Sequence, residues 1–298
     1  MPYTHFGKQA DVWKHLSLCE VMVNQQPQIY IETNSACSGY SLDNTPEQRY
    51  GIYSFLEKSP DYKELLNSKY FELESMAIKD NKYLGSPGLA MSILGNTVDK
   101  FIFFDIEEAP LDNIVGFARL NQLEDKTETI NRDSVTGVMD LLSTLPNSTL
   151  IHIDPYCIDM PGTNGYNYID LFVKASELGL KCFLWYGFNT LDEKKQINDF
   201  ITENLKNSTA DNLSCVELIM EVIQKDTIPC NPGILGSGLL SGNLSEKSLF
   251  AIVLYSELLI GLYKGTSYNN FKGNLYRDII ELKNSCLHFG DNAKNQLK

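Results

Sequence analysis

The alternation of short apolar strands with amphipathic helices restricts this chain to few folds. The sequence predicts strands and helices in turn, not a block of strands followed by a block of helices. Strands are expected at residues 28–32, 101–105, 127–131, 149–154 and 181–186, with extended stretches near 214–222 and 233–242. This order indicates an α/β fold with a mostly parallel, Rossmann-like sheet and helices on both faces.

Apolar residues at helical spacing predict the elements that cover the sheet. Helices are expected at residues 10–23, 112–120, 134–145, 168–178 and 191–205. The most apolar stretch, Leu249 to Tyr263, is too short to span a bilayer and contains Glu257, so it predicts a buried helix and no membrane association. The N-terminus lacks a basic region followed by an apolar one, so no signal peptide is expected.

One segment interrupts the alternation. Residues about 44–83 are polar, rich in Tyr, Glu, Lys and Asn, and helical in character, which predicts a small helical insertion after the first strand. The main domain is expected to span residues 1–264. Residues 265–298 are expected to form a C-terminal helical extension, with one helix at residues 274–285.

Composition narrows the function. The chain has 298 residues, of which 43% are hydrophobic and 21% charged, as in ordinary globular proteins. Its 25 basic and 38 acidic residues give a net charge of −13, so it does not coat nucleic acid through bulk charge, although a local basic groove is left open. The 7 scattered cysteines form no Cys-x-x-Cys pair, which predicts reduced thiols and a cytoplasmic location. The 4 histidines lack ligand spacing, so no metal is expected.

Acidic residues end three of the predicted strands: Glu32, Asp105 and Asp154. In open α/β sheets ligands bind outside the carboxyl ends of the strands, where the strand order reverses. Any one of these acids could equally be a helix N-cap or a solvated turn residue. Three together, in an alternating chain, favour a binding site.

The third acid begins a rigid turn. Pro155 follows Asp154 and has no backbone N–H to donate, so an Asp-Pro-Tyr turn can present a carbonyl and the ring of Tyr156 to a flat substrate. Asp133 opens a helix and could either accept from an adenine amino group or cap that helix. Cys157 could be a nucleophile, but a small buried apolar residue is the simpler interpretation, and His152 is read as a core residue.

Several segments together resemble a known family. They are Gly7 to His15 (G-K-Q-A-D-V-W-K-H), Tyr30 to Tyr40, Tyr83 to Pro87 with its Gly-Ser-Pro, Ile153 to Tyr156, and Leu184 to Tyr186, with a weaker echo in Gly236 to Gly238 and Asn243. Over residues 3 to 260 the chain resembles the 23S ribosomal RNA adenine-N6-methyltransferases of the RlmJ type. These are class I enzymes that use S-adenosylmethionine.

The resemblance implies a role for each matching residue. Around the methionine part of the cofactor it places Lys14, Glu32, Asn34 and Ser86. It implies that Asp105 holds the ribose and Asp133 meets the adenine of the cofactor. Asp154 and the carbonyl of Pro155 would accept hydrogen bonds from the target amino group, and Tyr3 and His5 would lie near the active site. The implied partner is RNA.

The chain also departs from the family pattern. Glu32 replaces an aspartate, Ala36 and Ser38 stand where the family has glycines, and the turn lacks a second proline, so the stacking ring has either moved to Tyr156 or been lost. Two alternatives therefore stay open. One is a methyltransferase of the same fold acting on a peptide, a protein or a small amine, and the other is a non-catalytic relative.

Overall fold

A central sheet organises the computed structural model, which describes residues 6–220, 234–263, 267–268, 271–272 and 275–280. The sheet has eight strands in the order β12-β8-β9-β7-β6-β1-β4-β5. Their bounds are β1 (Ile29–Glu32), β4 (Lys100–Asp105), β5 (Thr127–Asn131), β6 (Leu150–Ile153), β7 (Lys181–Phe188), β8 (Leu213–Met220), β9 (Gly236–Gly242) and β12 (Leu275–Ile280).

The connectivity places a switch in strand order beside β1. The chain moves outward from β1 to β4 and β5, then returns to the other side of β1 and continues through β6 and β7, and all five of these strands are parallel. Strand β9 is inserted antiparallel between β7 and β8. This is a Rossmann-like α/β fold with a mostly parallel sheet and helices on both faces, so the predicted fold class is confirmed.

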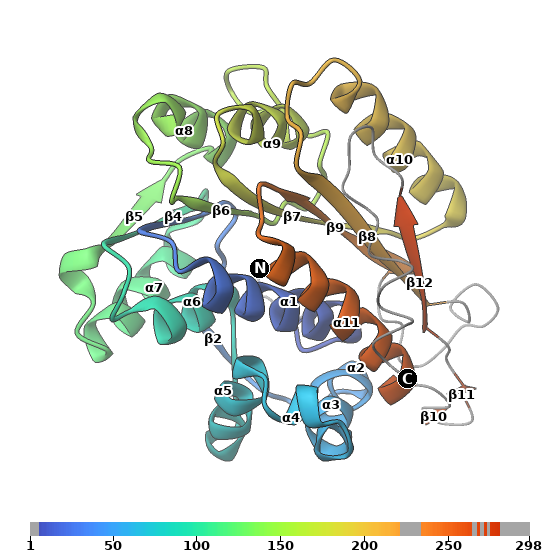
Figure 1. Cartoon of the computed structure of the whole chain (residues 1–298). Helices are drawn as coiled ribbons and strands as arrows, with labels where there is room; N and C mark the ends of the chain where they lie inside the picture. The colour runs from blue at the N-terminus through green and yellow to red at the C-terminus, as the bar shows by residue number, and fades with distance from the viewer. Residues whose placement is uncertain (1–5, 221–233, 264–266, 269–270, 273–274, 281–298) are drawn as a thin grey trace.

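Helices cover both faces of the sheet (Figure 1). On one face lie α1 (Gln9–Gln25), α6 (Ser86–Leu94), α7 (Glu108–Leu120) and α11 (Glu246–Tyr263). On the other lie α8 (Ser134–Leu141), which ends in a 3-10 turn, α9 (Tyr168–Glu177) and α10 (Leu191–Leu205). Each face has its own apolar cluster, and successive strand residues divide between them: Tyr30 packs on the α1 side and Ile31 on the α9 side.

The predicted apolar helix is α11, which packs along α1. The indole Nε1 of Trp13 donates to Ser256 Oγ at 3.0 Å, and both side chains are buried. The apolar run thus covers the α1 side of the molecule, as its buried character predicted. Among the helices in the described part of the chain, none has the length and apolar content needed to cross a bilayer.

The insertion is helical, as predicted, and is bracketed by a short ladder that was not. Strands β2 (Gly39–Ser41) and β3 (Lys82–Leu84) pair antiparallel and close the two ends of the insertion. Between them lie α2 (Pro46–Gln48), a π-helical turn (Arg49–Tyr53), α3 (Ser54–Lys58), α4 (Lys63–Leu66) and α5 (Lys69–Ala77), with 3-10 turns at Ser59–Asp61 and Ile78–Asp80. In Figure 1 these helices lie below α1, away from the sheet.

The predicted helix at residues 274–285 is wrong. Residues 275–280 form β12, which pairs antiparallel with β8 at the edge of the sheet. The ladder pairs the backbone of this segment with β8 along one side and overrides its helical pattern. The short strands β10 (Ser267–Tyr268) and β11 (Phe271–Lys272) pair with each other. Residues 281–298, the remainder of the expected helical extension, lie outside the described residues.

Glu74 of α5 holds the end of the insertion in place. Its carboxylate accepts from the backbone N–H of Leu84 at 3.2 and 3.4 Å, just before the Gly-Ser-Pro segment. The side chain is buried, and this desolvation raises the pKa of Glu74 well above its ordinary value. The carboxylate therefore orients β3 but lowers stability when it is ionised.

We predict that Glu74→Gln raises the stability of the protein at neutral pH, because the amide keeps an acceptor for Leu84 and carries no charge. Because the native pKa of Glu74 is raised, its carboxyl group makes its full contribution to the free energy of unfolding below the unfolded pKa of about 4.5. That contribution is lost as the pH rises through the native pKa. The gain in Tm should therefore increase between pH 5 and pH 8, to roughly 2–4 °C for each kcal/mol recovered. Glu72→Gln, on the same helix but exposed, is the control for thermal melts. An equal gain in both variants at every pH would contradict this account.

Candidate cofactor-binding site

Three acidic residues meet at the carboxyl edge of the sheet, on the side covered by α1 and α6. Glu32 ends β1, Asp105 ends β4, and Asp154 directly follows β6. Because β1 lies between β4 and β6, and Glu32 is in register with His152, the three acids occupy neighbouring positions along this edge. The edge coincides with the switch in strand order, where open α/β sheets bind ligands.

The loop that follows β1 is fixed to both neighbouring strands. The N–H of Thr33 donates to the carbonyl of His152 at 3.0 Å, and Thr33 Oγ1 accepts from the N–H of Asp154 at 3.2 Å. On the other side the N–H of Ser35 donates to the carbonyl of Phe104 at 2.9 Å. The loop is therefore a rigid bridge across three strands.

Asp105 continues this bridge. One carboxylate oxygen accepts from the N–H of Ala36 at 3.0 Å and the other from the N–H of Glu107 at 2.9 Å. The side chain of Asn113 accepts from the N–H of Ser38 at 2.8 Å. Asp105, predicted as the ribose acceptor, thus orients the loop, and each of its oxygens has a second lone pair beyond these hydrogen bonds.

The loop adopts the left-handed conformation without glycine. Asn34 and Ala36 both have φ of 52°. Asparagine tolerates this region, whereas alanine is strained in it. The close contact that glycine permits occurs instead on the opposite helix: a Cβ on Gly85 would lie 2.0 Å from the carbonyl oxygen of Cys37, and one on Gly88 would lie 2.1 Å from that of Ser38. Gly85 of the Gly-Ser-Pro segment and Gly88, which follows it, therefore let the loop lie against the start of α6.

We predict that Ala36→Gly stabilises the protein, because glycine adopts this φ without a Cβ clash. The relief of left-handed strain, roughly 1–2 kcal/mol, exceeds the added entropy of the unfolded chain, about 0.4–1 kcal/mol. Urea unfolding should show a higher midpoint. Ala118→Gly, in the last turn of α7, should lower it instead, and a lower midpoint for both variants would show that Ala36 is not strained.

Glu32 is fully buried within a polar network. Its Oε1 accepts a short hydrogen bond from Ser86 Oγ and lies 3.3 Å from His152 Nδ1, and its Oε2 accepts from the hydroxyl of Tyr30 at 2.9 Å. The His152 Nδ1 is also 3.2 Å from that hydroxyl. His152 is a core residue, as expected, but one that contacts the candidate site.

Lys14 reaches the site from α1, on the face of the sheet that this helix covers. Its Nζ lies 2.7 Å from Asp154 Oδ2, 3.8 Å from Asp11 Oδ1 and 5.2 Å from the centre of the Trp185 ring. Burial alone would lower the pKa of Lys14, but the carboxylates of Asp154, Asp11 and Glu32 outweigh it and raise the pKa. Burial also raises the pKa of Asp11, against the effect of Lys14. One ammonium group thus lies among three carboxyl groups.

The contacts of Lys14 with Asp11 and with the ring of Trp185 were not predicted. The spacing of Asp11 and Lys14, three residues apart on one helix, was a signal for a side-chain pair. For Trp185 only the periodicity of β7 gave a signal, since alternate residues of that strand face α1. These contacts place a cation and an aromatic ring beside Asp154.

The structure brings some of the predicted site residues together and leaves others apart from them or undescribed. Residues placed around the loop and the switch point are Lys14, Glu32, Asn34, Ser86, Asp105 and Asp154. Pro155 is buried behind this edge, and the ring of Tyr156 is 100% exposed. Tyr3 and His5 lie outside the described residues.

Asp133 is engaged as a helix cap. Its Oδ1 accepts from the N–H of Thr136 at 2.8 Å and lies 3.4 Å from the N–H of Thr163. Both groups are backbone donors, so this oxygen fixes the start of α8 against the loop that follows the Asp-Pro-Tyr turn. The capping interpretation is therefore present in the structure, and contact with a cofactor adenine stays a prediction.

The expectation that Cys157 is a buried apolar residue is wrong, because its side chain is exposed beside the turn. Its thiol donates to Asp159 at 2.8 Å. This hydrogen bond, and to a lesser degree burial, raises the pKa of Cys157. A raised pKa leaves little thiolate at neutral pH, which does not favour a nucleophile.

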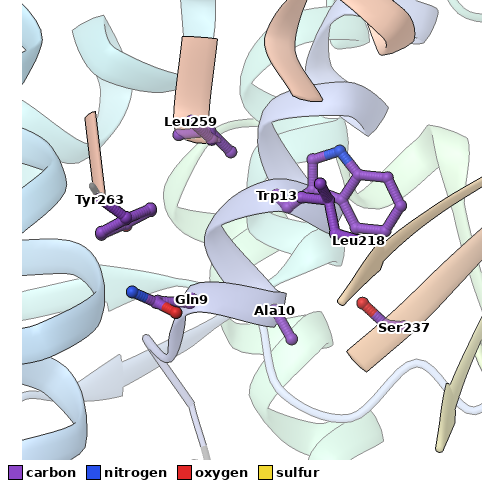
Figure 2. A pocket seen from close by; sticks show the side chains of 7 residues that line it. All are labelled: Gln9, Ala10, Trp13, Leu218, Ser237, Leu259 and Tyr263. Carbon is purple, nitrogen blue, oxygen red and sulfur yellow. The ribbon is translucent and has the colours of Figure 1, made fainter. Parts of the chain in front are cut away.

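A small cavity lies elsewhere, between α1, α11, β8 and β9 (Figure 2). Its lining is mostly apolar, from residues such as Trp13, Leu259 and Tyr263, with the amide of Gln9 at its edge. Among the described residues, neither amide atom of Gln9 has a hydrogen-bond partner. The volume of about 10 Å³ is at the lower limit for one water molecule, so this cavity cannot hold a cofactor.

Within the described residues, no three His, Cys, Asp or Glu side chains gather closely enough to hold a metal ion. The candidate site is instead a set of carboxylates, a lysine, a serine hydroxyl and a helix N-terminus. Such groups suit an organic ligand that carries both positive and negative charges.

Comparison with solved structures supports the fold. The chain is similar to protein LPL1258 from Legionella pneumophila, described as a DUF519 protein, with a TM-score of 0.70 and 20% identity over 95% of this chain and 100% of that one. Weaker likenesses are an O-methyltransferase from Bacillus cereus in complex with SAH (TM-score 0.42, 10% identity, 80% and 83% of the two chains) and the O-methyltransferase TomG from Streptomyces achromogenes (TM-score 0.38, 12% identity, 77% and 78%). No protein-family model and no curated protein matches the chain.

We predict that Asp154→Asn lowers the pKa of the Lys14 ammonium, because it removes the nearest of the carboxylates that oppose desolvation. The titration of Lys14, followed by NMR of labelled lysine side chains, should move to lower pH. Asp140→Asn, which removes an exposed partner of Arg132, is the control and should leave it unchanged. An unaltered Lys14 titration in Asp154→Asn would contradict the proposed ion pair.

Proposed function

We propose that this protein is an S-adenosylmethionine-dependent N-methyltransferase, a divergent relative of the RlmJ type, that methylates the exocyclic amine of an adenine in ribosomal RNA. The observation that carries the proposal is the grouping of Glu32, Asp105 and Asp154 with Lys14 at the switch point of a class I methyltransferase fold. The motif resemblance over residues 3 to 260 supports the same family and supplies the substrate class.

The residues present fit the cofactor. Asp105 ends the strand next to β1, where nucleotide-binding α/β folds bond ribose hydroxyls. The first turn of α6 has backbone N–H groups, such as that of Gly88, that find no partner within the helix itself, and such groups suit a carboxylate. Three carboxyl groups around a single lysine leave negative charge in excess, which suits a ligand with an ammonium and a sulfonium group.

The chemistry requires a reactive nitrogen beside the methyl donor. When bound, S-adenosylmethionine supplies an electrophilic methyl group. The adenine amine is a weak nucleophile because its lone pair is delocalised into the ring. Hydrogen bonds from its N–H groups to Asp154 and to the carbonyl of Pro155 would localise that lone pair and orient it, so positioning and electrostatics supply most of the acceleration.

Lys14 has a matching role in this scheme. Its ammonium contacts Asp154 Oδ2 and stabilises the ionised carboxylate, while the other oxygen can accept from the amine. The exposed ring of Tyr156 is available for stacking on the target base, which contributes roughly 1–3 kcal/mol per base in other proteins. A base in folded RNA must first be flipped out of its stack.

The net charge of −13 favours a second candidate, a methyltransferase of the same fold that acts on a peptide, a protein or a small amine. A strongly acidic protein approaches a phosphate backbone unfavourably. Filter binding with ribosomal RNA fragments separates the two candidates. The proposal requires affinity that falls steeply as salt rises, and the second candidate predicts no such RNA affinity.

We predict that the purified protein binds S-adenosylmethionine and S-adenosylhomocysteine in calorimetry and transfers a labelled methyl group to unmodified 23S ribosomal RNA. Asp154→Ala should reduce transfer by about 10²-fold or more, because the amine loses its main acceptor. Asp140→Ala, at an exposed ion pair, should not change it. Absence of cofactor binding would favour a non-catalytic relative, and normal turnover in Asp154→Ala would exclude the proposed role of this residue.

A further inference from the structure

Glu32 is placed where the resemblance implies contact with the cofactor, yet the protein itself covers it. Its side chain is 0% exposed, whereas Ser86, which donates to it, is 6% exposed at the first position of α6. Because Ser86 is the more exposed of the two, a ligand at this edge of the sheet would meet Ser86 before Glu32. The acid can act on such a ligand only through another group.

The hydrogen bonds of the network decide whether the Ser86 hydroxyl acts as a donor or as an acceptor toward a ligand. A serine hydroxyl has one proton, and Ser86 Oγ donates it to Glu32 Oε1. Among the described residues Ser86 Oγ accepts no hydrogen bond, so its lone pairs are available to a ligand. Toward the site, Ser86 is therefore an acceptor that suits an ammonium group and does not suit a carboxylate.

His152 and Tyr30 hold Glu32 in the orientation that this polarity requires. The Tyr30 hydroxyl donates to Oε2, so its oxygen and Glu32 Oε1 both present lone pairs to His152 Nδ1. Nδ1 thus faces only acceptors, which selects the form of the imidazole that carries a proton on Nδ1. The imidazole is fixed in place by the ladder between β1 and β6, in which Glu32 pairs with His152. The Phe183 ring also packs beside it, with 5.8 Å between the two ring centres.

We infer that His152 and Glu32 are positioning residues that orient the Ser86 hydroxyl to receive the primary ammonium group of the cofactor's amino-acid part. The inference rests on the proposed function, since it specifies how the same site recognises its ligand. Two features of the chain carry this inference: Glu32 is long enough to reach inward to His152, and Ser86 presents only lone pairs outward. The negative charge of Glu32 reaches the ammonium through one hydroxyl group.

The test compares ligands that differ by one group. Calorimetry measures the Kd of S-adenosylhomocysteine, of its deamino analogue and of its decarboxylated analogue, with 5′-methylthioadenosine as a reference that lacks both groups. The intact protein should prefer S-adenosylhomocysteine to the deamino analogue by about 10-fold or more, as a charge-assisted hydrogen bond predicts. Ser86→Ala and Glu32→Gln should bring this ratio close to one while leaving 5′-methylthioadenosine binding unchanged.

Matched variants separate positioning from loss of structure. Ser92→Ala, on the same helix but bonded to the carbonyl of Gly88, should keep the wild-type ratio. His152→Asn, whose amide can replace the Nδ1 donor, should retain most of the amine preference, and His152→Leu should lose it. If Glu32→Gln or His152→Leu fails to fold, the ratio in Ser86→Ala decides, since alanine is well tolerated at the start of a helix.

The outcomes distinguish this inference from the proposed function. If the wild-type protein binds none of these ligands, the proposed function fails. If it binds S-adenosylhomocysteine but Ser86→Ala leaves the amine preference intact, the inference is overturned. It is equally overturned if Ser86→Ala keeps the preference for S-adenosylhomocysteine over the deamino analogue but loses the preference over the decarboxylated analogue. That result would mean that Ser86 donates to the ligand carboxylate.

Discussion

The position of β1 between β4 and β6 is the constraint on which the candidate site depends. Parallel register brings the ends of the three strands to one edge, and the alternation of side chains turns Glu32, Asp105 and Asp154 toward α1. Lys14 then reaches Asp154 from α1, and one buried ammonium group shares the space with several carboxyl groups. The carboxyl groups at this edge outnumber the single ammonium group that the chain places there. This excess of acidic groups is the physical basis for expecting a cationic ligand.

Much of the fold could be predicted because periodicity and strand composition agree with the tertiary structure in the core. The strand ending in Asp105 and the helix Leu191–Leu205 are where the sequence placed them. The C-terminal segment could not be predicted, because β12 gains its conformation from the ladder with β8, a partner more than fifty residues away. The β2–β3 ladder around the insertion depends on a similar long-range pairing.

The site was predictable in its acids but not in its contacts. Acids at strand ends are visible in the sequence, whereas the partner of each acid depends on which helix covers it. The loop shows this most clearly: glycines were missing at residues 36 and 38, and the structure provides the close approach through Gly85 and Gly88 of the facing segment. The left-handed conformation is carried by Asn34 and by a strained Ala36. Cys157, read as buried, is exposed because the turn that carries it leaves the sheet.

The central claim is that the edge formed by Glu32, Asp105, Asp154 and the start of α6 is a binding site for a methyl-donor nucleoside. A crystal structure of the protein with S-adenosylhomocysteine tests it most directly. The account predicts a nucleoside with its ribose hydroxyls on Asp105 and its amino-acid part beside Ser86. A ligand found elsewhere, or no ligand at this edge at saturating concentration, would contradict it.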